Sequence, residues 1–233
     1  MKEIVVHHHL GLGDHFICNG LVHELSKKYR TIFLACKDKN YKTVNEMFKD
    51  TKNINIFRLK ENQFFFYKKN HDKFYEKQIN KFSEKENLEV IKIGFENCDR
   101  LEFNTSFYRQ VGLDFSHRYT SFKLPNKIEL EEEIFKMFSR KKYILVHRES
   151  SSRKYNLQIK SHIPIVEIDA RKDPFGNLLN YRKLIQKAYE IHCINSSVFH
   201  FVDSIETKAK LFYHDVRKRD FKIESKWNII NYN

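Results

Sequence analysis

Three short polar segments of this chain carry side chains that can bind phosphate or move a proton. They are LGLGDHF at residues 10–16, RESSSRK at residues 148–154 and INSSVFH at residues 194–200. Each follows a short apolar run, as a loop follows a buried strand. Glycines allow close approach to the backbone, hydroxyls and cations suit phosphate groups, and a carboxylate can accept a proton. We therefore take these three segments as the candidates for chemistry.

The first segment connects a predicted strand to a predicted helix. Residues 4–6 form an apolar run, Gly11 and Gly13 stand two apart, and from Asp14 onward apolar residues recur at helical spacing. Gly20 falls inside that helix, which predicts that the helix packs tightly on a sheet. A strand, a glycine turn and a helix together form the first unit of a Rossmann-like layer.

The residue after the glycine turn, Asp14, distinguishes this loop from a dinucleotide-binding loop. The dinucleotide motif needs a third glycine, and Phe16 occupies that position. A carboxylate at the start of the helix would also repel a pyrophosphate. Asp is among the best N-cap residues, so capping is the simplest interpretation of Asp14 from the helix alone.

The second segment offers hydroxyls and cations directly after the apolar run at residues 143–147. Ser150 and Ser151 supply the hydroxyls, and Arg153 and Lys154 supply two positive charges, a combination that suits a phosphate. A solvated turn is the alternative interpretation.

The third segment stands where a predicted helix begins. Asn195, Ser196 and Ser197 offer small polar side chains beside free backbone N–H groups, which can hold a diphosphate. The alternative is a Ser or Asn N-cap, with His200 packed against the sheet. Ligands of open α/β sheets bind outside the carboxyl ends of the strands. Three such segments at equivalent strand ends therefore favour function over coincidence.

Composition narrows the class of protein. The net charge of +13 suits nucleic acid, an anionic membrane surface or phosphorylated ligands, although a solvated lysine-rich surface accounts for much of it. No apolar run reaches the about 18 residues of a transmembrane helix, and a signal peptide's apolar segment is absent from the N-terminus. The four cysteines form no CxxC pair, which predicts reduced thiols. We expect a cytoplasmic protein, for which peripheral contact with a membrane is a further option.

Four histidines flank the glycine turn: His7, His8, His9 and His15. They lack a carboxylate or cysteine partner at a recognisable metal-binding spacing, so we expect no metal site. A hydrogen bond to a ligand and packing in the core both remain open for them.

Strands and helices alternate along the chain, which predicts a parallel sheet in each of two halves. Strands are predicted at residues 4–6, 31–36, 54–59, 88–93, 143–147, 163–168 and 190–194. Helices are predicted from residue 14 and at 41–48, 104–111, 128–138 and 176–189. A charged helix or loop is predicted at 72–84, and a loop that opens into a helix at 194–205; residues 210–213 and a basic tail finish the chain. Aromatic residues at 63–67 could line a pocket. An extended connector at 118–125 places the domain boundary between residues 1–122 and 123–233.

The motifs resemble those of the ADP-heptose:lipopolysaccharide heptosyltransferase family. The xGxGD turn between strand and helix is similar to the family's N-terminal loop, which carries a catalytic Asp just after a Gly. INSSVFHFVDSI resembles the family's donor-site motif, roughly D-[ST]-G-x-x-H-x-A, with Asn195 in place of the Asp and Ser197 in place of the Gly. VHRESSSRK resembles the family's strand with a hydroxyl-rich loop and a Lys. The motifs follow the same order, and we identify a compact, divergent GT-B glycosyltransferase.

This resemblance implies an α/β, GT-B-like fold of two small Rossmann-like domains that face each other across a cleft. The N-terminal domain would lie on the acceptor side, and the C-terminal domain would bind the nucleotide sugar. Asp14 would be the general base. Donor-binding residues would be Ser150, Ser151, Arg153, Lys154, Asn195, Ser196, Ser197 and His200. The loop at the cleft would contain Gly11, Gly13 and His15.

The implied reaction moves a hexosyl or heptosyl group from a nucleotide-diphosphate sugar to a hydroxyl of a glycan or lipid-linked acceptor. Arg153, Lys154 and the helix start at Ser196 would stabilise the leaving diphosphate. No cofactor besides the nucleotide-sugar co-substrate is expected, and no clear DxD motif is present, in agreement with metal-independent, inverting transfer.

Three other classes remain open. A basic nucleic-acid-binding protein would fit the charge, but the chain lacks an RNP motif, a zinc finger and a clean helix-turn-helix signature, so no specific nucleic acid is expected. A non-catalytic nucleotide-sugar binder would keep the fold without turnover. A nucleotide-dependent oxidoreductase is disfavoured by Asp14 and by the missing third glycine.

Overall fold

The computed structural model describes residues 1–61, 68–99, 102–138, 141–151, 153–169, 175–217 and 223–232. The chain divides into two compact units, the first made of Met1–Asp99 and Phe103–Pro125 and the second mainly of Asn126–Asn233. The predicted domain boundary lies three residues before Pro125. The aromatic run at 63–67 lies outside the described residues. Among the described helices, none combines the length and the apolar character needed to cross a membrane.

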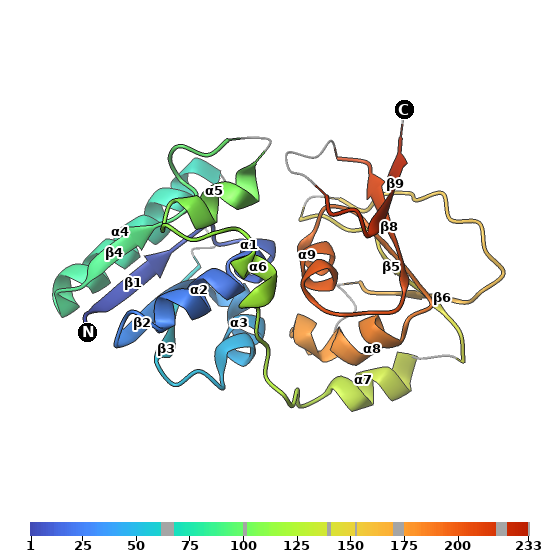
Figure 1. Cartoon of the computed structure of the whole chain (residues 1–233), viewed down its shortest axis with the longest axis horizontal. Helices are drawn as coiled ribbons and strands as arrows, with labels where there is room; N and C mark the ends of the chain where they lie inside the picture. Colours follow the sequence, from blue (N-terminus) through green and yellow to red (C-terminus); the bar gives the residue numbers. More distant parts are fainter. Residues whose placement is uncertain are drawn as a thin grey trace. The chain divides into compact units, whose positions relative to one another are not determined.

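The first unit is built on a four-stranded parallel sheet (Figure 1). Its strands are β1 (Glu3–His7), β2 (Thr31–Lys37), β3 (Ile54–Leu59) and β4 (Glu89–Lys92), in the order β3-β2-β1-β4. Val5 pairs with Phe33 on one side and with Val90 on the other. The strand predictions are confirmed to within about two residues, because both faces of a parallel sheet are covered and its strands read as apolar runs.

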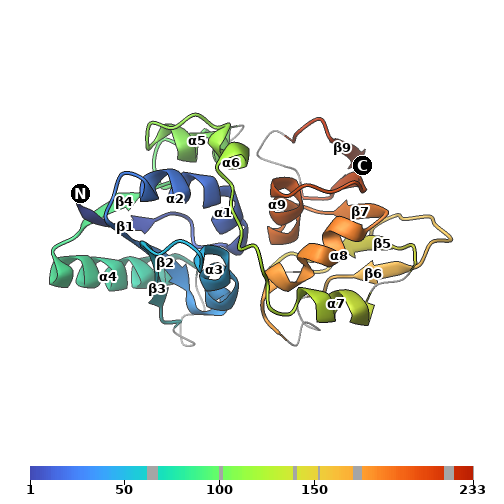
Figure 2. The same cartoon turned by 60° about the horizontal axis from the view of Figure 1, so that its bottom comes forward.

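Helices cover both faces of this sheet. They are α1 (Leu12–Ile17), α2 (Asn19–Ser26), α3 (Tyr41–Phe48), α4 (Lys68–Glu86), α5 (Phe103–Arg109) and α6 (His117–Thr120), with a 3₁₀ turn η1 at Asp38–Asn40. Tyr75 and Ile79 of α4 pack against Val5, Ala35 and Leu59. The opposite face, on the side of α2 (Figure 2), carries side chains such as Ile4 and Val6, which are fully buried.

Several details of the first unit differ from the prediction. The helix expected from Asp14 begins earlier, at Leu12, and breaks at Cys18, whose φ and ψ of −86° and 0° separate α1 from α2. The charged segment at 72–84 is helical, as part of α4. The connector expected to be extended from residue 118 instead begins within α6.

Gly20 does allow close packing, but its partner is α6 and not the sheet. A Cβ atom at this position would stand 2.0 Å from the carbonyl oxygen of His117. The helix–helix contact is therefore set by backbone against backbone, and the sequence prediction that α2 uses Gly20 to pack on the sheet is wrong.

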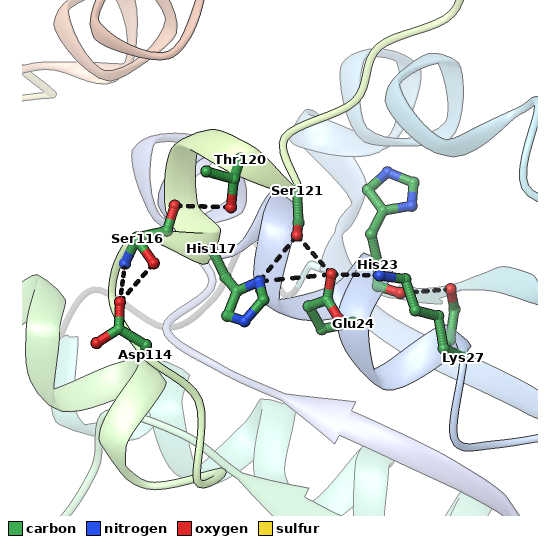
Figure 3. A network of polar contacts seen from close by, with 9 residues as sticks. His23, Glu24, Lys27, Asp114, Ser116, His117, Thr120 and Ser121 are labelled. Atoms are coloured by element: carbon green, nitrogen blue, oxygen red, sulfur yellow. Dashed lines mark hydrogen bonds and ion pairs between the residues drawn. The ribbon is translucent and has the colours of Figure 1, made fainter.

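Polar contacts fasten residues 114–123 to α2 (Figure 3). The side chain of Asn19 exchanges two hydrogen bonds with the backbone of Lys123, at 2.9 and 2.8 Å. The carboxylate of Glu24 accepts a hydrogen bond from the hydroxyl of Ser121 and pairs with Lys27 at 2.5 Å. The contacts of Asn19 with Lys123 and of Glu24 with Ser121 join residues about a hundred positions apart and hold α6 over Gly20.

The second unit contains a five-stranded parallel sheet. Its strands are β5 (Ile144–His147), β6 (Ile165–Glu167), β7 (Glu190–Cys193), β8 (Lys210–Asp215) and β9 (Trp227–Asn231), in the order β6-β5-β7-β8-β9. Its helices are α7 (Glu131–Phe138), α8 (Arg182–Lys187) and α9 (Ser197–Ser204), with a 3₁₀ turn η2 at Leu178–Tyr181. The helix predicted at 176–189 is therefore a 3₁₀ turn followed by a short α-helix.

The second sheet is covered on one face by an irregular segment, and it contains a strand that the sequence did not predict. Ile144 and Val146 are covered by Leu157, Tyr155 and Ile159, which lie in a segment without regular helix among its described residues. The tail expected to be only basic also contains a strand, β9. Its Trp227 is buried and donates a hydrogen bond to the carboxylate of Asp203, at 2.9 Å.

The tight contact at Gly20 gives a test of the first unit. Gly20→Ala should lower the free energy of unfolding by about 1–3 kcal/mol, because the added methyl group must displace backbone and not a flexible side chain. Chemical denaturation measures the change. Asn45→Ala, at an exposed position of α3, is the matched control and should be neutral or slightly stabilising. A Gly20→Ala protein as stable as the control would contradict the packing described here.

Candidate functional site

The strand order places a topological switch point in each unit. From β1 the chain runs outward through β2 to β3 and then returns to the other side of β1 to form β4. In open α/β sheets, ligands bind outside the carboxyl ends of the strands at such a point. The loop that follows β1 therefore lies at the expected place, and His9 in this loop donates from Nε2 to the carbonyl oxygen of Gly94, just beyond β4, at 2.6 Å.

Asp14 is the third residue of α1 and not its N-cap, so the capping interpretation drawn from the sequence is wrong. Gly11 is the N-cap, and Gly13 lies within the first turn. The backbone of Gly11 hydrogen-bonds to the Asp14 carboxylate, as an acidic residue at this position does in one half of a capping box. A Cβ atom on Gly11 would stand 2.6 Å from Oδ2 of Asp14, so glycine makes room for the returning carboxylate.

The electrostatics of Asp14 are those of a proton acceptor that works near neutral pH. Burial raises the pKa of Asp14 to about 7, although hydrogen bonds with the Gly11 backbone and the positive charge of Lys37 act to lower it. Lys37 ends β2, the neighbouring strand, and burial lowers the pKa of its ammonium group. A carboxyl group with a pKa near the working pH is suited to general base catalysis.

The histidines around this loop are packed as neutral rings. The rings of His8 and His15 meet edge to face, with centroids 4.4 Å apart. Burial lowers the pKa of His8 to about 4 and that of His15 well below its ordinary value. His15 is only 1% exposed, so its ring belongs to the core of the unit. Within the described ranges, no group of three or more His, Cys, Asp or Glu side chains could hold a metal ion.

In the second unit the switch point lies between β5 and β7, and both predicted phosphate-binding segments follow these two strands. The segment after β5 forms a tight turn. The amide of Ser150 donates to the carbonyl of Arg153 at 2.9 Å, and the amide of Arg153 donates to the hydroxyl of Ser150 at 3.1 Å. Ser151 is exposed at the tip. Ser150 thus shapes the turn, while the guanidinium of Arg153 lies over the ring of Tyr155, 4.4 Å from its centroid.

The environment of Lys154 differs from that of the other residues predicted to bind phosphate. Its ammonium group pairs with the carboxylate of Glu167 at 2.5 Å and with that of Asp169 at 3.4 Å. The hydrogen bond with Glu167 is the main cause that raises the pKa of Lys154. Two carboxylates therefore already balance this charge in the described structure.

The segment after β7 opens α9. Ser196 is the N-cap, and its hydroxyl accepts a hydrogen bond from the amide of Phe199 at 3.3 Å. Ser197 is the first helical residue, and His200 is buried against Phe199. The alternative prediction, a helix N-cap, is therefore confirmed for Ser196. Asn195 and Ser197 remain partly exposed.

Sequence reasoning missed Arg217, which completes this group. Arg217 follows β8, and its Nη1 donates to the carbonyl oxygen of Asn195 at 2.6 Å. Burial acts to raise the pKa of Tyr155, but hydrogen bonds with Arg153 and Ser150 and the charges of Arg153 and Arg217 lower it. Two guanidinium groups therefore stand near one phenol. The sequence prediction assigned this arginine to the basic tail, and β8, two positions before it, was not predicted as a strand.

Taken together, the two parallel sheets and their switch points define a GT-B-like fold of two Rossmann-type units. No protein family model matches the chain, and no curated protein matches it. Solved structures that share the fold include two glycosyltransferases. One is the glycosyl transferase family 9 protein from Veillonella parvula DSM 2008, with a TM-score of 0.57, 9% identity and coverage of 99% of this chain and 87% of the other. The other is E. coli ADP-heptose LPS heptosyltransferase II, with a TM-score of 0.53, 9% identity and coverage of 99% and 90%.

The raised pKa of Asp14 predicts a pH-dependent cost in stability. The folded state holds a proton on this group up to a pH of about 7, whereas the unfolded chain releases it near 3.8. The stabilising contribution of the protonated carboxyl is therefore full below pH 3.8 and is lost as the pH rises to about 7. Asp14→Asn should raise the free energy of unfolding by about 2–4 kcal/mol at pH 8 and by much less at pH 4.

Thermal unfolding of both proteins across this pH range measures the difference. Asp50→Asn, which removes one exposed carboxylate, is the charge-matched control and should show no comparable gain. If Asp14→Asn is less stable than the parent at pH 8, the prediction is wrong. The hydrogen bond between the Gly11 backbone and the Asp14 carboxylate would then stabilise the protein by more than burial of the charge destabilises it.

Proposed function

We propose that this protein is a glycosyltransferase that moves a sugar from a nucleotide-diphosphate donor to a hydroxyl acceptor, with Asp14 as the general base. The observation that carries the proposal is the Asp14 carboxyl, with a pKa of about 7, in the first turn of α1, directly after the loop that follows β1 at a switch point. The fold supports it, because both solved structures described above, which share this fold, are glycosyltransferases.

In the proposed reaction, Asp14 accepts the proton of the acceptor hydroxyl as that oxygen attacks the anomeric carbon. The bond from the sugar to the diphosphate breaks on the opposite side, so the anomeric configuration inverts. The carboxylate needs no separate partner to be poised, because burial already places its pKa near neutrality. A hydroxyl of a glycan or of a lipid-linked acceptor fits this role, and the transferred sugar is of the hexosyl or heptosyl type.

The second unit is proposed to bind the donor diphosphate. Charge grows on the leaving diphosphate as the glycosidic bond breaks, and preorganised donors stabilise it. Arg153 and Arg217 supply guanidinium groups, which bind phosphate oxygens bidentately. The N-terminus of α9 at Ser196 adds backbone N–H groups and the positive end of the helix dipole. These groups suffice for metal-independent transfer, with the nucleotide sugar as the co-substrate.

The base assignment predicts a selective loss of turnover. Asp14→Asn should lower kcat by about 10²–10⁴, because a general base contributes a factor of this size. Donor binding should stay close to that of the parent, since Asp14 lies in the other unit from the proposed donor site. For the parent, kcat/KM should rise with pH to about 7 and then level off, as the carboxyl loses its proton.

A thermal-shift panel of nucleotide sugars and nucleoside diphosphates in EDTA first identifies the donor, because a ligand that binds the folded state raises the unfolding midpoint. Transfer and nucleotide release are then measured with that donor. Wild-type turnover by a folded Asp14→Asn protein would refute the base assignment. A shift with oligonucleotides alone would refute the glycosyltransferase proposal.

The two cations of the second unit predict different effects on donor affinity. Arg217→Ala should weaken binding of the nucleoside diphosphate about 10- to 100-fold, because a hydrogen bond to a charged group contributes about 1.5–3 kcal/mol. Lys154→Ala removes the same charge but should weaken binding less, since Glu167 and Asp169 already pair with that ammonium group. Titration calorimetry compares the two variants, and a larger loss for Lys154→Ala would reverse the assignment.

A further inference from the structure

Five lysines gather at the amino-terminal edge of the second unit's sheet. This lysine patch consists of Lys141 and Lys142 before β5, Lys187 before β7, and Lys208 and Lys210 at the start of β8. Together with Tyr189 and Pro164 they line an open cavity of about 900 Å³. The strands are parallel, so this edge is opposite to the one that bears the proposed donor site. A strand the length of β5 spans about 13 Å, so the patch is a separate surface.

The positive charge of the patch is poorly balanced. Over the described ranges, the structure records no ion pair for Lys141, Lys187 or Lys208, and Lys210 reaches only Glu190, at 4.0 Å. Lysines elsewhere in the same unit are closely paired, such as Lys154 with Glu167. Like charges gathered without partners repel one another, and an anionic ligand relieves that repulsion.

Apolar groups accompany these charges. Tyr189 is 37% exposed, and the ammonium groups of Lys142 and Lys210 lie 3.7 and 5.4 Å from the centroid of its ring. Ile165 is 45% exposed and follows Pro164 of the cavity lining. A tyrosine with an apolar body and a polar tip, next to long lysine stems, is the combination that settles at a membrane interface.

We propose that the lysine patch binds the anionic phosphate headgroups of a membrane surface, with Tyr189 and Ile165 entering the headgroup layer. The patch crosses the ends of four neighbouring strands, β6, β5, β7 and β8, which span about 14 Å. That width matches several headgroups and not a single phosphate. Lysines near an anionic surface each add attraction without needing a fixed geometry.

Two features of the patch argue against nucleic acid as its ligand. The charges in the cavity lining come from lysine alone, whereas arginine provides the planar, bidentate contacts typical of nucleic-acid recognition. The ring of Tyr189 also has an ammonium group at 3.7 Å from its centroid, which leaves that face closed to base stacking.

Vesicle flotation with the full chain tests the proposal without any nucleotide sugar, so it is independent of the proposed enzymatic function. The protein should float with phosphatidylcholine vesicles that contain phosphatidylglycerol, remain behind with phosphatidylcholine alone, and dissociate at high salt. The triple variant Lys141→Gln, Lys187→Gln, Lys208→Gln should bind about a hundredfold more weakly, at about fivefold for each lysine. Replacing Tyr189 and Ile165 by Ser should also weaken binding while leaving the charge intact.

The control is the triple variant Lys28→Gln, Lys52→Gln, Lys81→Gln, which removes the same charge from exposed positions of the first unit. It should bind vesicles nearly as well as the parent. Equal losses in both triple variants would show a diffuse charge effect and overturn the proposal. Failure to float with anionic vesicles would overturn it as well, as would binding of random oligonucleotides that depends on the patch while vesicle binding does not.

Discussion

A parallel sheet must be covered on both faces, and this chain meets that requirement in each unit with few residues. In the first unit α4 covers one face of the sheet through Tyr75 and Ile79, and the opposite face of the sheet is also buried. The position of α2 is in turn fixed by residues 114–123, which contact it through Gly20 and Asn19. In the second unit an irregular segment around Leu157 takes the place of a helix over Ile144 and Val146. The elements that cover the sheets therefore also hold in place the strand ends at which the candidate site residues lie.

The sequence predicts the strands well because burial on both faces leaves a local signal. The runs at 54–59 and 41–48 agree with β3 and α3 to the residue. Signals that depend on distant residues could not be read in the same way. The partner of Gly20 is a carbonyl oxygen nearly a hundred positions away, and the position of the glycine in a helix does not reveal which surface it faces. The strand β9 was missed because its short run, WNIIN, is interrupted by Asn228, shows no regular alternation and follows a basic stretch.

The same limit applies to the site. Residue types and spacing identified the three loops, and the strand order places them at the two switch points. The sequence could not show that the Asp14 carboxylate folds back onto Gly11 and is partly withdrawn from solvent there, since that depends on how the first turn of α1 begins. Nor could it show that Lys154 meets Glu167 and Asp169, which come from a different strand and the residues after it. The contact of Arg217 with Asn195 follows from the pairing of β8 with β7, which the sequence does not reveal.

The outer strands of the two sheets have a consequence for how the chain behaves at high concentration. The edge strand β6 is three residues long, and β4 has four residues with Glu89 and Lys92 exposed at its ends. On β3, Asn55 and Arg58 point into solvent. Short edges that carry charges are poor templates for pairing with a strand of another molecule. Three of the four outer strands of these sheets, which form slowly because their contacts are distant in sequence, are thereby poor seeds for aggregation. The fourth outer strand, β9, carries no charge and exposes Asn228 and Ile229, so its edge lacks this protection.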